Sequence, residues 1–566
     1  MSISHTDVFK GFEVTLSKYQ MKLKMYLYTW AMIFLLQCLV SFLISLVTFS
    51  GAWKLLIEYI MPSLTSFSLP NFQTLFELIG KLIKASMHIF IFTLPLWLLY
   101  PLLMKRFAKK AKEITEESYV AGSKIGNEKE VIDILKKEPS RLSIGNIPLP
   151  IREEAKHIFI IGKSGSGKTV LLSNIIEHLR QHNLKTVIYD SKGLYISRFY
   201  DPGKDLIFNP LDARGVDWNL FSEIETPMDI TSIAASLIPV SADWNDPYWP
   251  NAARDLFSGI LHHLYEKDEK NNSAIWQTVT TEIPALAELM KSSRGGRIAY
   301  SHIQDCSKQA SSVVSVMSLH CACFQFMLQG RSDFSIKKWL TADNGGFIFV
   351  SNYSEIEDTL KPVISLFIDQ FARRTLSMPD DFNRRIFLVL DEFGTLQKLS
   401  SIQNFLTQGR SKGGSCVFAV QDVGQIEKIY SKEIRQAIVN AASTNVICGV
   451  ADPDTAEYLA RKIGKTRVIK AEESFGMGPE DMRDGININR RETEKDLFMP
   501  SDLMNLPDLT ALIKISHHPL VMSKYDYKEY PFSQQSMFLL REGLSMGDIY
   551  NSYRQNLEAV QTLFAR

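Results

Sequence analysis

The sequence lacks the features that mark several common protein classes. Its six cysteines are scattered, so no disulfide framework is predicted and we expect reduced thiols in a cytosolic compartment. The formal net charge is +1, so any contact with a polyanion such as nucleic acid must come from local clusters of Lys and Arg. It has no repeat and no low-complexity tract. The 45% of hydrophobic and 22% of charged residues are instead typical of folded domains, and 566 residues predict about three or four of them.

Two long runs near the N-terminus contain no charged residue, at 26–49 and 85–104. Each is long enough to cross a hydrocarbon core, which needs about 20 residues of helix. Lysines precede the first run, and Lys and Arg follow the second, which predicts that both chain ends face the cytoplasm. A cleaved signal peptide and a pair of buried helices are the alternatives. We favour a two-span anchor within 1–110, with an external loop at about 50–84.

The remaining chain changes character several times. Residues 111–150 are charged and loop-like, which indicates a linker. Within 151–225 and 341–530, short β-rich apolar runs alternate with helical segments, which predicts an α/β domain with a mostly parallel sheet. The strand-like runs stop within 226–340, so we predict an all-helical insertion there, and 531–566 is a short amphipathic tail. The predicted strands are 157–161, 186–190, 346–351, 386–391, 415–421, 444–450, 509–516 and 519–525.

A glycine-rich loop follows the first of these strands and precedes an apolar-periodic helix. Its residues are Gly162, Lys163, Ser164, Gly165, Ser166, Gly167, Lys168 and Thr169. This order of strand, loop and helix is that of a P-loop, whose backbone N–H groups turn toward phosphate oxygens. The start of the helix adds its positive dipole end. We predict an ATP site in which Lys168 reaches the β and γ phosphates and Thr169 binds Mg²⁺.

Hydrolysis also needs a carboxylate for the metal ion and a group that activates water. Asp391 and Glu392 follow five apolar residues of a strand, and such buried parallel strands carry functional residues at their carboxyl ends. We predict that Asp391 holds Mg²⁺ and that Glu392 is the general base; the alternative is a helix N-cap. Gln421, at the end of another strand, is the candidate γ-phosphate sensor. Arg410 is either an arginine finger for a neighbouring subunit or an ordinary solvated arginine.

With these motifs placed, the chain resembles the coupling proteins of type IV secretion systems, within the TraD-like subgroup of conjugative systems. The resemblance is carried by the two-span N-terminus and by 161–168, 209–214, 246–249, 360–365, 391–393, 483–485 and 506–509. It implies a RecA-like sheet domain, a helical insertion facing the cytoplasm, and six subunits around a channel at the bacterial inner membrane. It also implies ATP-driven delivery of a relaxase-bound single DNA strand to the secretion channel. Positions matching the family's catalytic motifs are Lys168, Thr169, Asp391, Glu392, Arg410 and Gln421.

One expectation departs from the TraD-type pattern, and three other functions stay open. TraD-type proteins often carry a long C-terminal extension that contacts the relaxosome, whereas this sequence stops at Arg566. We therefore expect the tail or the helical insertion to dock the substrate. The alternatives are an FtsK-type DNA translocase, a coupling ATPase that exports protein effectors, and a nucleotide-gated scaffold. The sequence singles out no Lys or Arg as a DNA contact.

Overall fold

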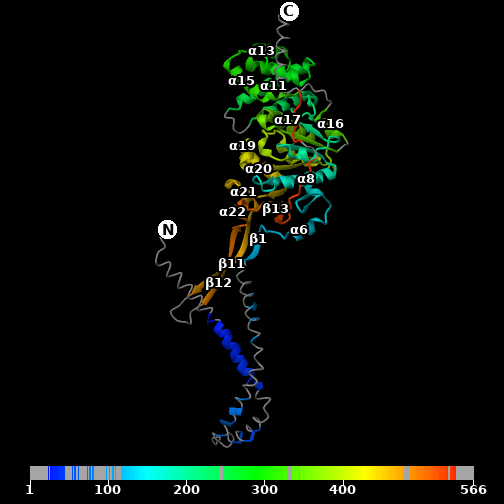
Figure 1. Ribbon diagram of the computed structural model, residues 1–566. Helices are drawn as coiled ribbons and strands as arrows, with labels where there is room; N and C mark the ends of the chain where they lie inside the picture. The colour runs from blue at the N-terminus through cyan, green and yellow to red at the C-terminus, as the bar shows by residue number, and fades with distance from the viewer. Residues whose placement is uncertain are drawn as a thin grey trace, which may run out of the picture. The chain divides into compact units, whose positions relative to one another are not determined.

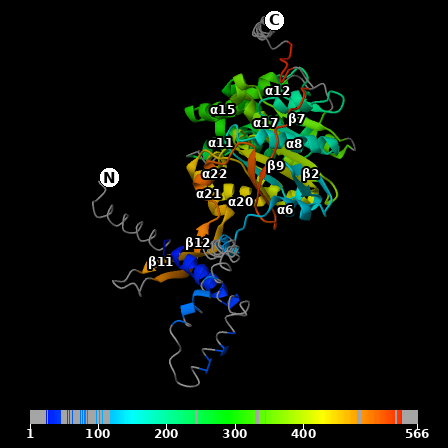
Figure 2. The same cartoon turned by 60° about the horizontal axis from the view of Figure 1, so that its bottom comes forward.

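The computed structural model describes most of the chain from residue 117 onward. The described ranges are 117–240, 246–327, 334–342, 345–476, 485–532 and 536–542, with single residues and short segments between 23 and 109. The chain forms two compact units (Figures 1 and 2). Unit 1 comprises Met1–Val120 and Arg467–Thr493, and unit 2 comprises Ala121–Thr466 and Glu494–Arg566.

Unit 1 contains the part of the first predicted span that the structure describes, which is helical from 26 to 41. The indole of Trp97 donates a hydrogen bond of 2.7 Å to the Gln37 side chain and packs edge-on against Trp30. Apart from Trp97 and Pro101, the second predicted span lies outside the described residues. Among the residues that are described, none belongs to a helix with the length and apolar character to cross a membrane.

A three-stranded sheet of order β1-β11-β12 lies largely in unit 1. Its strands are β1 Ser118–Gly122, β11 Lys465–Gly476 and β12 Gly485–Asp496. The sequence patterns did not predict it, because β11 and β12 are rich in charged residues and carry no apolar run.

Unit 2 contains a large sheet with helices on both faces. A separate hairpin consists of β2 Ser140–Ile144 and β3 Ile147–Pro150. The strands of the large sheet are β4 Ile158–Ile161, β5 Lys185–Asp190, β6 Leu206–Phe208, β7 Phe347–Ser351, β8 Ile386–Leu390, β9 Gly414–Val420, β10 Thr444–Ile447, β13 Thr510–Ile515 and β14 Val521–Lys524. The helices of unit 2 are α6 Glu128–Leu135, α7 Ile151–Glu154, α8 Lys168–Gln181, α9 Leu194–Phe199, α10 Pro227–Leu237, α11 Tyr248–Glu266, α12 Asn272–Val279, α13 Ile283–Ser292, α14 Arg297–Ile303, α15 Lys308–Cys321, α16 Ile336–Thr341, α17 Glu357–Leu376, α18 Ile402–Gln408, α19 Val423–Tyr430, α20 Lys432–Ala441, α21 Pro453–Ile463 and α22 Pro500–Met504.

The large sheet has nine described strands in the order β14-β13-β10-β4-β9-β8-β5-β7-β6. The strands from β10 to β6 run parallel, and β13 and β14 are antiparallel to their neighbours. Every residue of β4, β7, β8 and β9 is buried, as expected of parallel strands covered by helices on both faces. The predicted α/β class with a mostly parallel sheet is confirmed.

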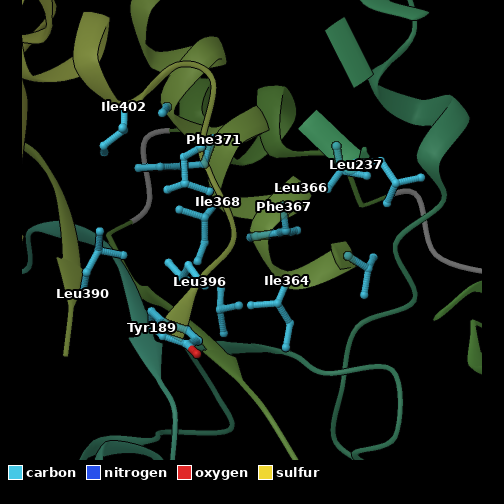
Figure 3. Close-up of a cluster of buried hydrophobic side chains, with 14 of the residues drawn as sticks. Tyr189, Leu237, Ile364, Leu366, Phe367, Ile368, Phe371, Leu390, Leu396 and Ile402 are labelled. Atoms are coloured by element: carbon cyan, nitrogen blue, oxygen red, sulfur yellow. The ribbon is translucent and has the colours of Figure 1, made fainter. Parts of the chain in front are cut away.

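Alternate side chains of the central strands enter two hydrophobic cores, one on each face. One core packs beneath α8 and the other beneath α17. Figure 3 shows part of the second core, in which Tyr189 of β5 lies below Ile364 and Ile368 of α17, with Leu390 of β8 on one side and Leu237 of α10 on the other. This packing holds α10 and α17 on one face of the sheet.

In the sequence, the helices α10 to α16 come between β6 and β7, and these two strands pair with each other in the sheet. Short polar residues cap the starts of four of these helices. Thr226 and Asp229 form a capping box at α10, and Asn271, Ser307 and Ser335 cap α12, α15 and α16 through their side chains. Figure 1 shows α11, α13 and α15 gathered at one end of unit 2.

The prediction of a loop-like linker at 111–150 is wrong from residue 118 onward, where the chain forms β1, α6 and the β2-β3 hairpin. Asn127 caps α6, whose Val131 and Leu135 are buried. Leu142 and Ile144 of β2 are also buried, in the core beneath α8. The many charged residues between these apolar positions face solvent, so the segment is part of the folded unit.

Candidate nucleotide-binding site

The glycine-rich loop joins β4 to α8 in a conformation that requires its glycines. Gly165 and Gly167 have φ angles of 82° and 103°, in the left-handed region that other residues avoid. A Cβ atom on Gly167 would also lie 2.5 Å from the Tyr525 hydroxyl. Gly167 immediately precedes α8, so the loop delivers its backbone N–H groups to the start of a helix of 14 residues.

Hydrogen bonds from other segments hold this loop in place. The backbone N–H of Lys163 donates to the Gly449 carbonyl at 2.7 Å, and that of Leu509 donates to the Ser166 carbonyl at 3.2 Å. The Ser166 hydroxyl donates to the Lys163 carbonyl at 2.7 Å. Ser166 is thus buried, and its hydroxyl is hydrogen-bonded to the backbone of the loop itself. These hydrogen bonds fix the loop to the residue before β13 and to the segment after β10.

A cavity of about 640 Å³ opens over the loop, a volume typical of small-molecule sites. The predicted site residues that line it are Lys163, Ser164, Gly165, Gly167, Lys168, Thr169, Asp391, Glu392 and Gln421. Gly162 and Ser166 lie outside the lining, and a Cβ on Gly162 would come within 2.6 Å of the Cys448 Cβ. Strands far apart in the sequence therefore bring most of the predicted residues to one place.

Lys168 is the buried cation of this cavity. Its ammonium donates to the Gly162 carbonyl, at the base of the loop. Burial lowers the pKa of Lys168, and the carboxylates of Glu392 and Asp391 oppose that shift. The cavity lining thus combines lysines with carboxylates, a charge pattern that fits a phosphate group together with a divalent metal ion.

Asp391 follows β8 and is positioned by α9. The Tyr195 hydroxyl donates to Asp391 Oδ1 at 3.0 Å. Asp190, at the end of β5, in turn accepts from the backbone N–H groups of Leu194 and Ile196 at 3.0 and 2.9 Å and so fixes α9. Burial raises the pKa of Asp391 to about 6, against the lowering effect of the Tyr195 hydrogen bond. Sequence reasoning missed Tyr195 and Asp190, although Asp190 occupies a strand end as Asp391 does.

Glu392 and Gln421 form the second polar pair of the cavity. The strands β8 and β9 are adjacent and parallel, so the residues after them meet at one edge of the sheet. There Gln421 Nε2 donates to Glu392 Oε2 at 2.9 Å. Glu392 Oε1 is buried and has no hydrogen-bond partner among the described residues. A carboxylate oriented through one oxygen, with the other left to accept a proton, has the geometry of a general base.

Thr169 lines the same cavity as Asp391, so a hydroxyl and a carboxylate oxygen lie in its wall. Such oxygens are the ligands that Mg²⁺ prefers. These residues therefore fit the magnesium ion predicted from the sequence.

Arg410 lies elsewhere. It is exposed in η7 (Gly409–Lys412), immediately before β9, whereas Gln421 immediately follows β9. A strand of 7 residues spans about 20 Å at roughly 3.3 Å per residue. Arg410 is therefore not brought to the cavity of its own subunit.

Residues 141–523, more than half of the chain, match the family described as the type IV secretion-system coupling protein DNA-binding domain. The chain belongs to this family. The resemblance expected from the sequence motifs is thereby confirmed.

Coupling protein TraD of Escherichia coli (strain K12) is 28% identical over 436 residues, which are 75% of this chain and 60% of TraD. Protein VirD4 of Agrobacterium fabrum is 23% identical over 391 residues, 65% of this chain and 58% of VirD4. The chain thus spans about 60% of the length of these curated relatives.

Solved structures of the conjugative coupling protein TrwB share the fold. The unbound form superposes with a TM-score of 0.67 at 25% identity, covering 75% of this chain and 96% of that one. A second structure, with the same TM-score and identity, contains TrwB in complex with ADP and Mg²⁺ and is covered to 98%. The RecA-type α/β fold that the family resemblance implied is confirmed.

Proposed function

We propose that the protein is an ATP hydrolase that drives a relaxase-bound single DNA strand into a type IV secretion channel. The observation that carries this proposal is the meeting of Lys168, Asp391, Glu392 and Gln421 around one cavity. Membership of the coupling protein family supports DNA transfer as the process that this site would drive. The nucleotide and metal seen with TrwB support ATP and Mg²⁺ as its ligands.

Each residue of the cavity has a separate role in this proposal. The loop amides and Lys168 bind the phosphates, and Thr169 and Asp391 hold Mg²⁺, which neutralises phosphate charge when bound. Tyr195 orients Asp391. Glu392 accepts the proton of the attacking water on Oε1, and the Gln421 amide keeps the Glu392 carboxylate turned toward the phosphates.

Arg410 acts on a neighbouring subunit. Its place about 20 Å along β9 from the cavity of its own chain supports this role. A guanidinium that enters the next cavity around a ring would stabilise the charge of the transition state. A homohexamer supplies such a neighbour at every site.

The remaining architecture is proposed from the sequence. Spans at 26–49 and 85–104 anchor the protein in the bacterial inner membrane, with both chain ends cytoplasmic. Residues 151–225 and 341–530 form the nucleotide-binding domain. The helical insertion at 226–340, or the tail at 531–566, recruits the relaxosome.

The decisive test is ATP turnover by the full-length protein with and without single-stranded DNA. We expect stimulation by DNA, with binding that weakens steeply as salt rises, because phosphate contacts release counterions. Stimulation by duplex DNA alone would favour an FtsK-type translocase. Turnover that responds to an effector protein and ignores DNA would favour protein export, and ATP binding without turnover would favour a scaffold.

A further inference from the structure

Unit 2 contains a second cavity, of about 340 Å³, that shares no lining residue with the nucleotide site. It lies beside the C-terminal end of α21, against β10 and β13. This is the face of the sheet opposite α8, since Ile447 packs in the core of α17 while α8 packs in the other. The lining residues are Gly122, Ser123, Lys124, Asn445, Ile447, Lys462, Ile463, Lys514, His517, Pro519 and Leu520.

The charges of this cavity have one sign. Three lysines line it, Lys124, Lys462 and Lys514, and no Asp or Glu belongs to the lining. Lys462 Nζ donates to the Val439 carbonyl at 3.0 Å, and Lys514 Nζ donates to the His518 carbonyl at 2.6 Å. Within the described part of the chain, neither of these two ammonium groups has an ion pair.

The environment of Lys462 and Lys514 makes this absence of counter-charge costly. Burial lowers the pKa of both side chains, that of Lys462 to about 8. Each ammonium group has three donors, of which a backbone carbonyl takes one. Capping a carbonyl is a structural role for each lysine, yet it supplies no negative charge. An anion bound between them would compensate two desolvated cations at once.

We propose that this cavity is a binding site for a phosphate ester with a small organic part. The phosphate would lie between Lys462 and Lys514. The apolar side chains of Ile447, Ile463 and Leu520 would cover the organic part, and the volume exceeds what inorganic phosphate alone would fill. The site is independent of the nucleotide loop and of the proposed function.

The test is calorimetric titration of the full-length Lys168→Ala protein, in which the nucleotide loop is disabled. The probes are inorganic phosphate, adenosine monophosphate and glycerol 3-phosphate, added separately. We expect one site per chain, tighter for one of the esters than for phosphate, and the preferred ester shows whether the source is nucleotide-like or lipid-like. Lys462→Met and Lys514→Met should each weaken binding about tenfold or more, while Lys291→Met, at an exposed position of α13, should not.

The proposal is overturned if none of the probes binds at millimolar concentration, or if Lys462→Met and Lys514→Met leave binding unchanged. A chemical measurement keeps the test independent of those variants, in case Lys462→Met does not fold. The bound ester should protect Lys462 and Lys514, but not Lys291, from reductive methylation followed by mass spectrometry. Equal modification with and without ester at saturating concentration would also overturn it.

Discussion

Two cavities of unit 2 each contain a lysine whose pKa is lowered by burial, but the two cavities differ in the charges that surround that lysine. Lys168 shares its cavity with Asp391 and Glu392, whose carboxylates oppose the lowering of its pKa by burial. Lys462 shares its cavity with two other lysines, donates to a backbone carbonyl and lies over the Phe159 ring, and none of these contacts supplies a negative charge. A site with charges of both signs suits a phosphate that arrives with a metal ion. A site lined by cations alone suits an anion that binds without a metal ion.

The largest expected effect concerns the first cavity. Lys168→Ala should lower ATP turnover by at least about 100-fold, because the cation that reaches the phosphates is lost. Steady-state turnover and nucleotide binding measure it, with Lys291→Ala as the matched control. Comparable turnover in Lys168→Ala and the control would show that the balance of charge in this cavity does not serve hydrolysis.

Glu392→Gln separates binding from chemistry in the same cavity. It keeps the shape of the side chain and removes the basic oxygen, so ATP binding should persist while turnover falls by about 100-fold or more. Fluorescent nucleotide titration and phosphate release measure the two quantities. If turnover is unchanged, the base has been assigned to the wrong residue.

Arg410→Ala tests whether a nucleotide site needs a positive charge from the neighbouring subunit. We expect turnover to fall roughly 100-fold with nucleotide affinity unchanged, because the guanidinium would act only in the transition state of a neighbour. Lys412→Ala, on the same turn η7, is the control. Adding Arg410→Ala protein to Glu392→Gln protein should restore part of the turnover in mixed rings. Full activity of Arg410→Ala alone would contradict a role in trans.

The raised pKa of Asp391 predicts that the Mg²⁺ requirement of turnover depends on pH. Burial favours the neutral carboxyl, so Asp391 is protonated below its pKa of about 6 and becomes a weaker metal ligand there. The Mg²⁺ concentration needed for half-maximal turnover should therefore rise as pH falls through 6, up to about tenfold per pH unit. Measurements at pH 5.5 and 7.5 test this. A Mg²⁺ requirement that is identical at both would contradict the prediction.

Tyr195→Phe, which removes the hydrogen bond to Asp391, should have a smaller effect than the loss of a catalytic side chain. That bond lowers the pKa of Asp391, so its loss should shift the pH profile upward. A bond to a charged group contributes about 1.5 to 3 kcal/mol, which bounds the loss of Mg²⁺ affinity at roughly 10-fold to 100-fold. Tyr189→Phe, which loses a bond to Thr395, is the control. An unshifted profile would remove Tyr195 from the site.

The parts of the fold that sequence predicted best are those with the strongest local signal. The apolar runs of β4, β8 and β9 predicted buried parallel strands, because a strand covered on both faces leaves no position for polar residues. The three residues of β6, Leu206–Phe208, were missed because so short a run has no period.

In the candidate site, too, the sequence predicted the residues that stand in local motifs and missed those that depend on tertiary contacts. Lys168, Asp391 and Glu392 stand in local motifs, and the parallel sheet predicts that strand ends meet. Tyr195 could not be found in this way, since its contact with Asp391 depends on the direction in which α9 crosses the end of β8. The cluster of lysines in the second cavity depends on three segments that have no common motif.

The strand β9 has a mechanical consequence for the proposed ring. It is buried along its whole length and hydrogen-bonded to β4 and β8, so it cannot stretch or bend independently. Gln421 follows one of its ends and Arg410 precedes the other. Any tilt of the strand that draws Gln421 toward one nucleotide would therefore displace Arg410 relative to the next. In such a ring β9 would act as a rigid lever that transmits a movement at one nucleotide site to the next.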